Sequence, residues 1–292
     1  MLTHQIRLHL IVVIFGFTGI LGKLIELPSQ LIVVYRMTLA CLALALFLWK
    51  NKSILPSNKR SRQKWFITGF IVGLHWFFFF ESIKLSNVSI ALVCFSSTAF
   101  FTAIMEPIFL RKKFQLYELA FSIMIIGGML LVLNFEYQYA RGILFGVLSA
   151  FLASLFTVLN SKYVVNNSSA LISFYELMGG GILILASIIV FDIQTLTIIP
   201  SPMDALYLLI LAIVATAFAF VVSISVMKKL SPFTVSLTIN LEPLYGILLA
   251  LFIFGQEEMM STGFYAGFTV ILATILLNAF LKKRQRKALN TN

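Results

Sequence analysis

The 292-residue chain alternates long apolar stretches with short polar gaps, and ten such stretches can be placed along it. Each is close to the ~20 residues that an α-helix needs to cross ~30 Å of hydrocarbon. The strict apolar/polar alternation of barrel strands is absent, and lipid offers no partner for an unpaired backbone group. We therefore expect transmembrane helices over residues 6–26, 31–49, 65–84, 88–110, 116–134, 141–163, 169–191, 203–228, 233–254 and 261–281.

The basic residues fall in alternate gaps, which predicts how the chain crosses the membrane. Of the 22 Lys and Arg residues, all but Lys23, Arg36, Lys84 and Arg141 lie near the N-terminus, in every second gap or in the tail. The other gaps carry acidic residues, namely Glu26, Glu136, Asp192, Asp204, Glu257 and Glu258. Because Lys and Arg are enriched on the cytoplasmic side, we expect a multi-pass protein of the cell (inner or plasma) membrane with cytoplasmic N- and C-termini.

The composition fits a bilayer better than it fits water. The chain is 60% hydrophobic and 11% charged, whereas soluble domains are about 45–50% apolar and about 25% charged. The net charge of +11 is spread over the cytoplasmic gaps in small groups, so it requires no nucleic-acid partner. Cys41 and Cys94 lie within apolar spans and predict neither a disulfide nor a metal site. The first span has no convincing cleavage site, so we expect no signal peptide.

Short sequence echoes indicate an internal duplication. The echoes are Phe17-Thr18 with Phe156-Thr157, Tyr35-Arg36 with Tyr175-Glu176, Lys84-Leu85-Ser86 with Lys229-Leu230-Ser231, and Asn134 with Asn278. Five spans in each half make residues 1–140 the first repeat and residues 141–292 the second. Because five is odd, the second repeat enters the membrane from the opposite side. The predicted fold class is an all-α integral membrane protein of ten transmembrane helices in two inverted five-helix repeats, an arrangement typical of secondary transporters.

A family resemblance rests on short segments in both halves. The segments are Gly73-Leu74-His75-Trp76, residues 82–89, Pro107 before Arg111-Lys112-Lys113, Lys229-Leu230-Ser231-Pro232, Leu241-Glu242-Pro243 and Phe254-Gly255-Gln256-Glu257. They resemble EamA-type transporters of the drug/metabolite transporter superfamily, over essentially the whole chain. The resemblance implies a carrier of amino acids or similar small metabolites, often outward, whose cavity is surrounded by the first four helices of each repeat. In the second half, the family pattern places a Gly-Glu element after the ninth helix. The corresponding place in the first half holds the basic residues 111–113 instead, so we do not expect the two places to share a role.

Ionisable side chains inside a membrane are costly, roughly 2.5–3.5 kcal/mol each on insertion scales, so each is a functional candidate. Arg36 could hold a substrate carboxylate with both arms of its guanidinium; a structural ion pair or a side chain that reaches the interface is the alternative. Glu176, its counterpart in the second repeat, could pair with Arg36, bind an amine or carry a proton. The neighbouring Gly179-Gly180-Gly181 is interpreted as a helix-packing segment.

The span 233–254 concentrates polar residues around a proline. Pro243 has no N–H, so the carbonyl of Ile239 loses its helical partner and a kink is expected. Asn240 and Glu242 flank this break, and Tyr245 lies on the same helix face as Glu242. A free carbonyl with polar neighbours suits a substrate or proton site. The alternative is a hinge whose polar groups are satisfied by neighbouring helices.

The spans 65–84 and 88–110 supply the remaining candidates. His75 could titrate and couple transport to protons, and a neutral buried histidine bonded to a carbonyl is the alternative. The expected substrate-binding residues are Arg36, Trp76, Ser97, Thr98, Tyr175, Asn240 and Tyr245; the proton-coupling candidates are His75, Glu176 and Glu242; Pro243 is the expected kink. Glu106 is instead expected to neutralise a neighbouring basic residue. No metal or other cofactor is expected.

These features favour a secondary transporter that moves a small metabolite by alternating access, and leave open whether protons are coupled. No nucleotide-binding P-loop is present, which argues against ATP-driven transport by this chain alone. An intramembrane enzyme is the second class, but neither HExxH nor GxSxG occurs; a passive channel or scaffold is the third.

The expected partners are a small-molecule substrate and the lipid bilayer, without nucleic acid. A GxxxG pair at Gly263 and Gly267 could serve a homodimer, and otherwise we expect a monomer.

Overall fold

The computed structural model describes residues 2–51 and 58–290, and this part of the chain is almost entirely helical. The first half contains α1 (Leu2–Leu24), α2 (Ser29–Lys50), α3 (Lys59–Leu85), α4 (Val88–Phe95), α5 (Thr98–Leu110) and α6 (Leu116–Phe135). A short 3₁₀ segment, η1 (Tyr137–Tyr139), leads into the second half. That half contains α7 (Ala140–Tyr163), α8 (Ser169–Phe191), η2 (Ile193–Thr197), α9 (Pro202–Ala212), the π-helix η3 (Ile213–Phe218), α10 (Ala219–Val226), α11 (Pro232–Ile239), α12 (Glu242–Phe254), η4 (Gly255–Glu258) and α13 (Thr262–Asn290).

Several helices begin at residues that satisfy the free N–H groups of a first turn. The Asn58 side chain accepts from the Arg60 backbone at the start of α3, and the Asn87 side chain accepts from Ile90 at the start of α4. Ser201 and Ser231 do the same for α9 and α11, and a proline follows each of them. Asn, Ser and a following proline are favoured at these positions because the first N–H groups have no partner within the helix.

The predicted all-α membrane fold is confirmed. Nine helical segments within the described residues are long and apolar enough to cross a membrane, and one further apolar helix, Thr262–Asn278, is shorter. Four of the nine contain more than one helical element, namely Val88–Leu110, Tyr137–Tyr163, Pro202–Val226 and Pro232–Glu258. Each of the ten spans expected from the sequence coincides with one of these segments.

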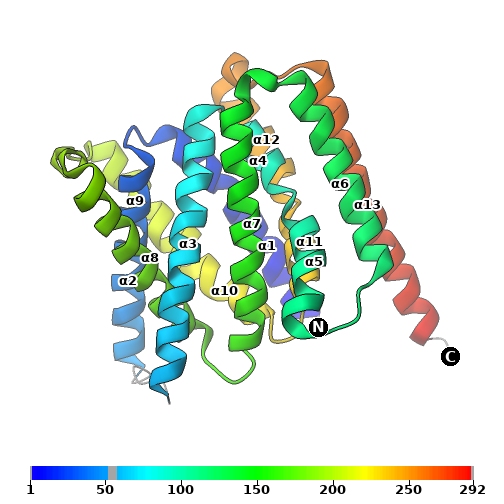
Figure 1. Ribbon diagram of the computed structural model, residues 1–292, viewed down its shortest axis with the longest axis horizontal. Helices are drawn as coiled ribbons and strands as arrows, with labels where there is room; N and C mark the ends of the chain where they lie inside the picture. Colours follow the sequence, from blue (N-terminus) through cyan, green and yellow to red (C-terminus); the bar gives the residue numbers. More distant parts are fainter. Residues whose placement is uncertain (1, 52–57, 291–292) are drawn as a thin grey trace.

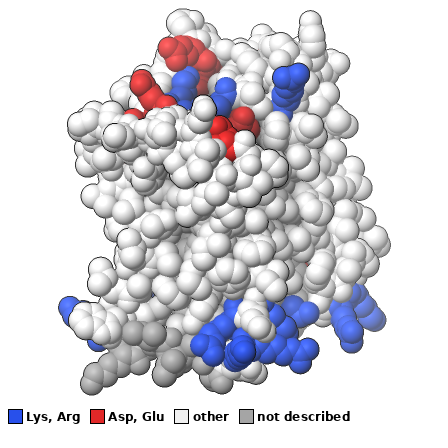
Figure 2. All heavy atoms as spheres, turned by 60° about the vertical axis from the view of Figure 1, so that its left-hand side comes forward, with Lys and Arg blue, Asp and Glu red and all other residues white. Residues whose placement is uncertain are grey.

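Apart from buried groups such as Arg36, Glu176 and Glu242, charged side chains lie at the two ends of the helical bundle (Figure 2). Figure 2 shows Lys and Arg clustered at one end, both signs of charge at the other, and an uncharged belt between them. We call the end where α3 begins and where α5, α7 and α10 end the basic end, and the opposite end the acidic end. The two chain termini lie at the same end (Figure 1). The side chains of Lys52 and of the basic residues at 282–287 lie outside the described residues.

Helix packing follows an inverted two-fold relation between the halves. Corresponding elements contact each other directly in three places: α2 with α8, α6 with α13, and the α4–α5 pair with the α11–α12 pair. Other contacts occur in matched sets, since α3 packs on α8 as α9 packs on α2, and α1 packs on α12 as α7 packs on α5. The α6–α13 pair runs side by side along one edge (Figure 1). This is the packing expected of two inverted five-helix repeats.

Glycines allow two of these contacts to be close. A Cβ on Gly69 would collide with the backbone of Glu176, and one on Gly180 would lie 2.5 Å from the carbonyl oxygen of Gly69, so α3 and α8 touch through their backbones. A Cβ on Gly128 of α6 would lie 2.7 Å from the carbonyl oxygen of Gly267 on α13. The packing role predicted for Gly179-Gly180-Gly181 fits the close contact at Gly180. Because Gly267 is covered within the chain, it gives no support to a homodimer.

Replacing Gly128 by alanine should destabilise the α6–α13 pair, because overpacking of this kind costs about 1–3 kcal/mol. Gly127→Ala is the matched control: no atom lies within 4 Å of its Cβ position, and alanine favours a helix over glycine by roughly 0.5–1 kcal/mol. Thermal unfolding in detergent should give a lower midpoint for Gly128→Ala and an equal or higher midpoint for Gly127→Ala. Equal midpoints for the two variants would contradict this packing.

Candidate functional site

The centre of the site is formed by two membrane-crossing helices that are broken midway. The break between α11 and α12 lies just before Pro243, so the kink predicted from the missing N–H is present. The break between α4 and α5 contains no proline; Ser96 and Ser97 stand there instead. Ser97 Oγ donates to the carbonyl of Cys94 (2.7 Å), so a side chain provides a partner near the break.

The two breaks are joined by side-chain hydrogen bonds. Asn240 Nδ2 donates to the carbonyl of Ser96 (2.6 Å), a residue 144 positions earlier, and Asn240 Oδ1 accepts from Thr98 Oγ1 (3.2 Å). One turn away, Thr102 and Ser236 share a hydrogen bond of 2.9 Å between their hydroxyls. Asn240 and Ser96 are the corresponding residues of the two breaks, so the inverted two-fold axis passes close to this joint. We call the contacts of Asn240 with Ser96 and Thr98 the central joint.

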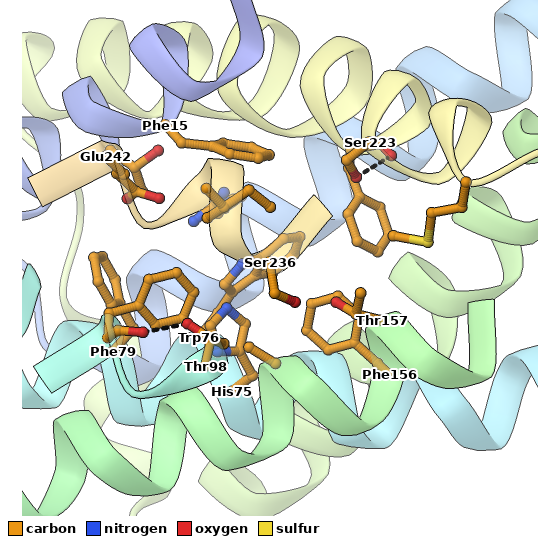
Figure 3. Close-up of a pocket in the computed structure, with 17 residues that line it drawn as sticks. Phe15, His75, Trp76, Phe79, Thr98, Phe156, Thr157, Ser223, Ser236 and Glu242 are labelled. Atoms are coloured by element: carbon orange, nitrogen blue, oxygen red, sulfur yellow. Dashed lines mark hydrogen bonds between the residues drawn. The ribbon is translucent and has the colours of Figure 1, made fainter. Parts of the chain in front are cut away.

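A cavity lies beside the central joint, and residues of both halves line it. The lining residues are Phe15, Thr18, Arg36, His75, Trp76, Phe79, Phe95, Thr98, Ala153, Phe156, Thr157, Phe220, Ser223, Met227, Ser236, Ile239 and Glu242. Figure 3 shows Glu242 and Phe15 on one wall, with Trp76, Thr98 and His75 on the opposite one. The space open to water-sized molecules is about 70 Å³. The cavity is therefore small, and its lining combines six Phe and Trp side chains with eight polar or charged ones.

Arg36 extends from α2 into the cavity and is held by the second half of the chain. Its Nε donates to Thr216 Oγ1 (2.6 Å) and its Nη2 donates to the carbonyl of Ala215 (3.3 Å). Both partners belong to η3, whose wider turn lets Thr216 Oγ1 donate to the carbonyl of Leu211, five residues earlier (2.7 Å). The guanidinium carbon lies 3.9 Å from the centre of the Trp76 ring, which is a cation–π contact. Buried Nη1 has no partner within the described residues.

Glu242, the first residue of α12, is the acidic group of the cavity. It is buried, and its carboxylate has neither a hydrogen bond nor an ion pair in the part of the chain that the structure describes. It lies close enough to Arg36 for the two charges to interact electrostatically, without forming an ion pair. The cavity lining thus contains one arginine and one glutamate, contributed by opposite halves.

His75 is held against α7 by its own hydrogen bonds. Its Nδ1 lies 3.0 Å from the carbonyl oxygen of Ser149 and 2.8 Å from Ser149 Oγ. The carbonyl can only accept, so Nδ1 donates to it when protonated, and in the other tautomer Nδ1 accepts from the hydroxyl. The rings of Phe95 and Phe156 lie 5.5 and 5.4 Å away, centre to centre. This geometry favours the alternative of a buried histidine bonded to a carbonyl over a role in proton coupling.

The predicted site residues outside the cavity lining are Ser97, Tyr175, Glu176, Asn240 and Tyr245. Glu176 accepts from Asn160 Nδ2 (3.0 Å) and forms no hydrogen bond or ion pair with Arg36 among the described residues. Its helix, α8, contributes no lining residue, because α3 packs directly against it through glycines and lies nearer the cavity. The expectation that the first four helices of each repeat surround the cavity is therefore wrong for α8. Tyr175 packs on Trp65 instead, with ring centres 6.0 Å apart.

Some residues of the site were not identified from the sequence. Thr216, which orients Arg36, lies in a π-helix, and an ordinary apolar stretch gives no sign of such a turn. Thr18 and the segment Phe156-Thr157 line the cavity. These were visible as one of the echoes between the two halves, so the duplication itself was a signal that could have identified them.

Comparisons with known proteins agree with the fold. The EamA-like transporter family matches residues 6–134 and again residues 140–280. A protein of Bacillus subtilis (strain 168) described as the uncharacterized transporter YxxF is 25% identical over 295 residues, which cover 98% of this chain and 92% of that protein. A crystal structure superposes with a TM-score of 0.73 at 14% identity, over 96% of this chain and 98% of the other, and shows a common fold. Because the family matches nearly all of both halves, the chain belongs to the EamA-like transporter family and is a membrane transporter.

Proposed function

We propose that this transporter carries small zwitterionic amino acids through the central cavity. The observation that supports this most directly is that Arg36 and Glu242 line one cavity and that neither has an ionic partner among the described residues. A zwitterion would supply both partners: its carboxylate would accept from Nη1 of Arg36, and its ammonium would donate to Glu242. Arg36 takes the carboxylate role expected from the sequence, and Glu242 replaces Glu176 as the amine-binding acid.

The electrostatics of the cavity favour a ligand with both charges. A buried charge without a partner is unfavourable by several kcal/mol, even after the protein relaxes around it. A hydrogen bond to a charged group contributes about 1.5–3 kcal/mol. Thr216, Ala215 and Trp76 orient the guanidinium but bring no negative charge. A ligand with only one charge would leave either Arg36 or Glu242 without a counter-charge.

The walls favour a ligand with a small apolar side chain. Phe79, Phe95, Phe156 and Phe220 line the cavity together with Trp76. The open space of about 70 Å³ holds roughly five water molecules at ~10–15 Å³ each. Any larger ligand would require these aromatic side chains to turn, so we place small apolar amino acids first among the candidate substrates.

The inverted packing supports transport by alternating access. In such carriers the substrate site lies at the interface of the repeats, and one repeat rocks against the other around it. We assign the two repeats to residues 1–140 and 141–292. We also assign the basic end to the cytoplasm of the cell (inner or plasma) membrane, because Lys and Arg are enriched on that side. Both termini would then be cytoplasmic, and the protein would be complete as a monomer.

Glu242 also supports exchange of the amino acid for a proton. A protonated Glu242 is neutral and no longer attracts an ammonium group, so a proton and the substrate would compete for it. The other ionisable groups of the cavity are Arg36 and His75, and His75 is held by Ser149. In a cell whose proton gradient points inward, such competition would drive export.

Conservative substitution of either charge should weaken amino-acid binding. Arg36→Lys keeps the charge but loses the planar fork, and Glu242→Gln keeps the shape but loses the charge. Each should raise the Kd for a bound small amino acid about tenfold to a hundredfold, the equivalent of one charge-assisted hydrogen bond. Binding of radiolabelled alanine to the purified protein measures this. The exposed Arg141→Gln variant is the control and should bind as the wild type does; equal binding by all four proteins would contradict the site.

Binding should also depend on pH in one direction. Only the ionised form of Glu242 attracts the ammonium group, so the affinity of the wild type should increase as pH rises through the titration of this group and then reach a plateau. Glu242→Gln should bind weakly, with no such rise. Alanine binding measured over a series of pH values checks this, and a wild-type affinity that falls or stays constant with rising pH would contradict competition at Glu242.

A further inference from the structure

Glu258, at the acidic end, binds the start of a helix from the other half. Its Oε1 accepts from the backbone N–H of Val88 (3.1 Å), and its Oε2 accepts from the N–H (3.0 Å) and Oγ (2.8 Å) of Ser89. Lys23 Nζ donates to Oε1 at 3.0 Å. A carboxylate is stabilised there because the first N–H groups of a helix lack helical partners and carry partial positive charge. We call this cluster of Glu258, Lys23, Val88 and Ser89 the acidic-end lock.

Glu106, at the basic end, makes the same kind of contact in the opposite direction. Its Oε2 accepts from the backbone N–H of Phe233 at the start of α11 (2.8 Å), and its Oε1 accepts from Lys112 Nζ (3.0 Å). The sequence predicted only that Glu106 would neutralise a basic neighbour, which Lys112 confirms. The contact with α11 was not foreseen. We call Glu106, Lys112 and Phe233 the basic-end lock.

The helix starts that the two locks bind are related by the inverted repeat. The helices they bind, α4 and α11, are the corresponding first segments of the two broken helices, and the central joint lies between the locks. The carboxylates are not corresponding residues: Glu106 lies in α5, and Glu258 is the last residue of η4, four positions after the end of α12. Each lock therefore ties one half of the chain to the other, and the two stand at opposite ends of the bundle.

The locks differ in how tightly they are closed. Glu258 accepts from two N–H groups, a hydroxyl and an ammonium, and its side chain is 0% exposed, with Lys23 at 23%. Glu106 accepts from one N–H and one ammonium; its side chain is 9% exposed, and Lys112 is 54% exposed. Water weakens charge interactions, so the basic-end lock is the weaker of the two in this conformation.

We propose that the two carboxylates are alternating locks of the transport cycle. The cavity opens at the acidic end when Glu258 releases the start of α4, and it opens at the basic end when Glu106 releases the start of α11, with the central joint as the pivot. This inference rests on the alternating-access function proposed above. It assigns positioning roles to Glu106, Glu258, Lys23 and Lys112, all of which lie outside the lining of the cavity.

Cysteine labelling tests the proposal. Cys41 and Cys94 are replaced by alanine, and a single cysteine is introduced either at Thr18, on the acidic-end part of α1, or at Ser223, near the basic-end terminus of α10. Both positions line the cavity. Each protein is reconstituted into liposomes of phosphatidylethanolamine and phosphatidylglycerol, and its rate of reaction with a membrane-impermeant thiol reagent is measured from each side. Glu258→Gln, Glu106→Gln and Glu257→Gln are then added in turn.

The variants should shift labelling in opposite directions. Glu258→Gln should increase acidic-end labelling of Thr18→Cys about tenfold, the effect of losing charge-assisted bonds, and should decrease basic-end labelling of Ser223→Cys. Glu106→Gln should increase basic-end labelling of Ser223→Cys and should not increase that of Thr18→Cys. Glu257→Gln is the matched control: Glu257 also lies 3.1 Å from Lys23, but its side chain is 73% exposed, so a change below about threefold is expected.

A second variant and a substrate test keep the interpretation unambiguous. Ser89→Ala removes one hydrogen bond to Glu258 and should act in the same direction as Glu258→Gln, less strongly, even if that variant folds poorly. An equimolar mixture of the standard amino acids should change the ratio of labelling at the two positions in the background protein. If it does not, the proposed amino-acid transport through this cavity is contradicted. If it does, while the Glu258, Glu106 and Ser89 variants all label like the background, only the locks are contradicted.

Discussion

The contact of Asn240 with the chain at Ser96 and Thr98 is the interaction on which the rest of the site depends. Both membrane-crossing helices are broken at this depth, and a broken helix leaves backbone groups that lipid cannot satisfy. Asn240 satisfies the carbonyl of Ser96 directly and holds Thr98 by its other side-chain atom. Because Glu242 follows two residues later, the same contact places the only acid of the cavity lining where the two halves meet.

The placement of charge follows from the cost of burying it. Arg36 is held by η3 and Trp76, so its direction is fixed while one nitrogen remains without a partner in the described structure. Glu242 faces the same cavity from the other half. Away from the cavity, Glu106 and Glu258 are placed on helix N-termini, where partial positive charge and an added lysine stabilise them. The charges that we propose as functional are therefore those that the protein orients but leaves without a counter-charge.

Much of the fold could be predicted because a bilayer imposes length, hydropathy and charge on each span. Arg36 and Glu242 could be identified because a charge inside an apolar span has few explanations.

The break at Ser96 was missed since no proline marks it, and η3 was missed since its turn depends on contacts that form only in the folded chain. Glu176 was chosen because it corresponds to Arg36 in the second repeat. Inverted repeats share backbone positions but not the surroundings of each side chain. In this structure α3 packs against α8 and lines the cavity, whereas α8 does not. The locks were missed because a carboxylate on a distant helix N-terminus is a tertiary contact that local sequence does not encode.

The central claim is that Arg36 and Glu242 bind opposite ends of one zwitterion. The most direct measurement is competition against bound alanine by propionate, which lacks the ammonium, and by ethylamine, which lacks the carboxylate, in the wild type, Arg36→Ala and Glu242→Gln. Our account predicts that each variant loses the preference for the group its missing residue would bind: Arg36→Ala should bind ethylamine and alanine alike, and Glu242→Gln should bind propionate and alanine alike. If both variants kept the full wild-type preference for alanine over both analogues, the account would be contradicted.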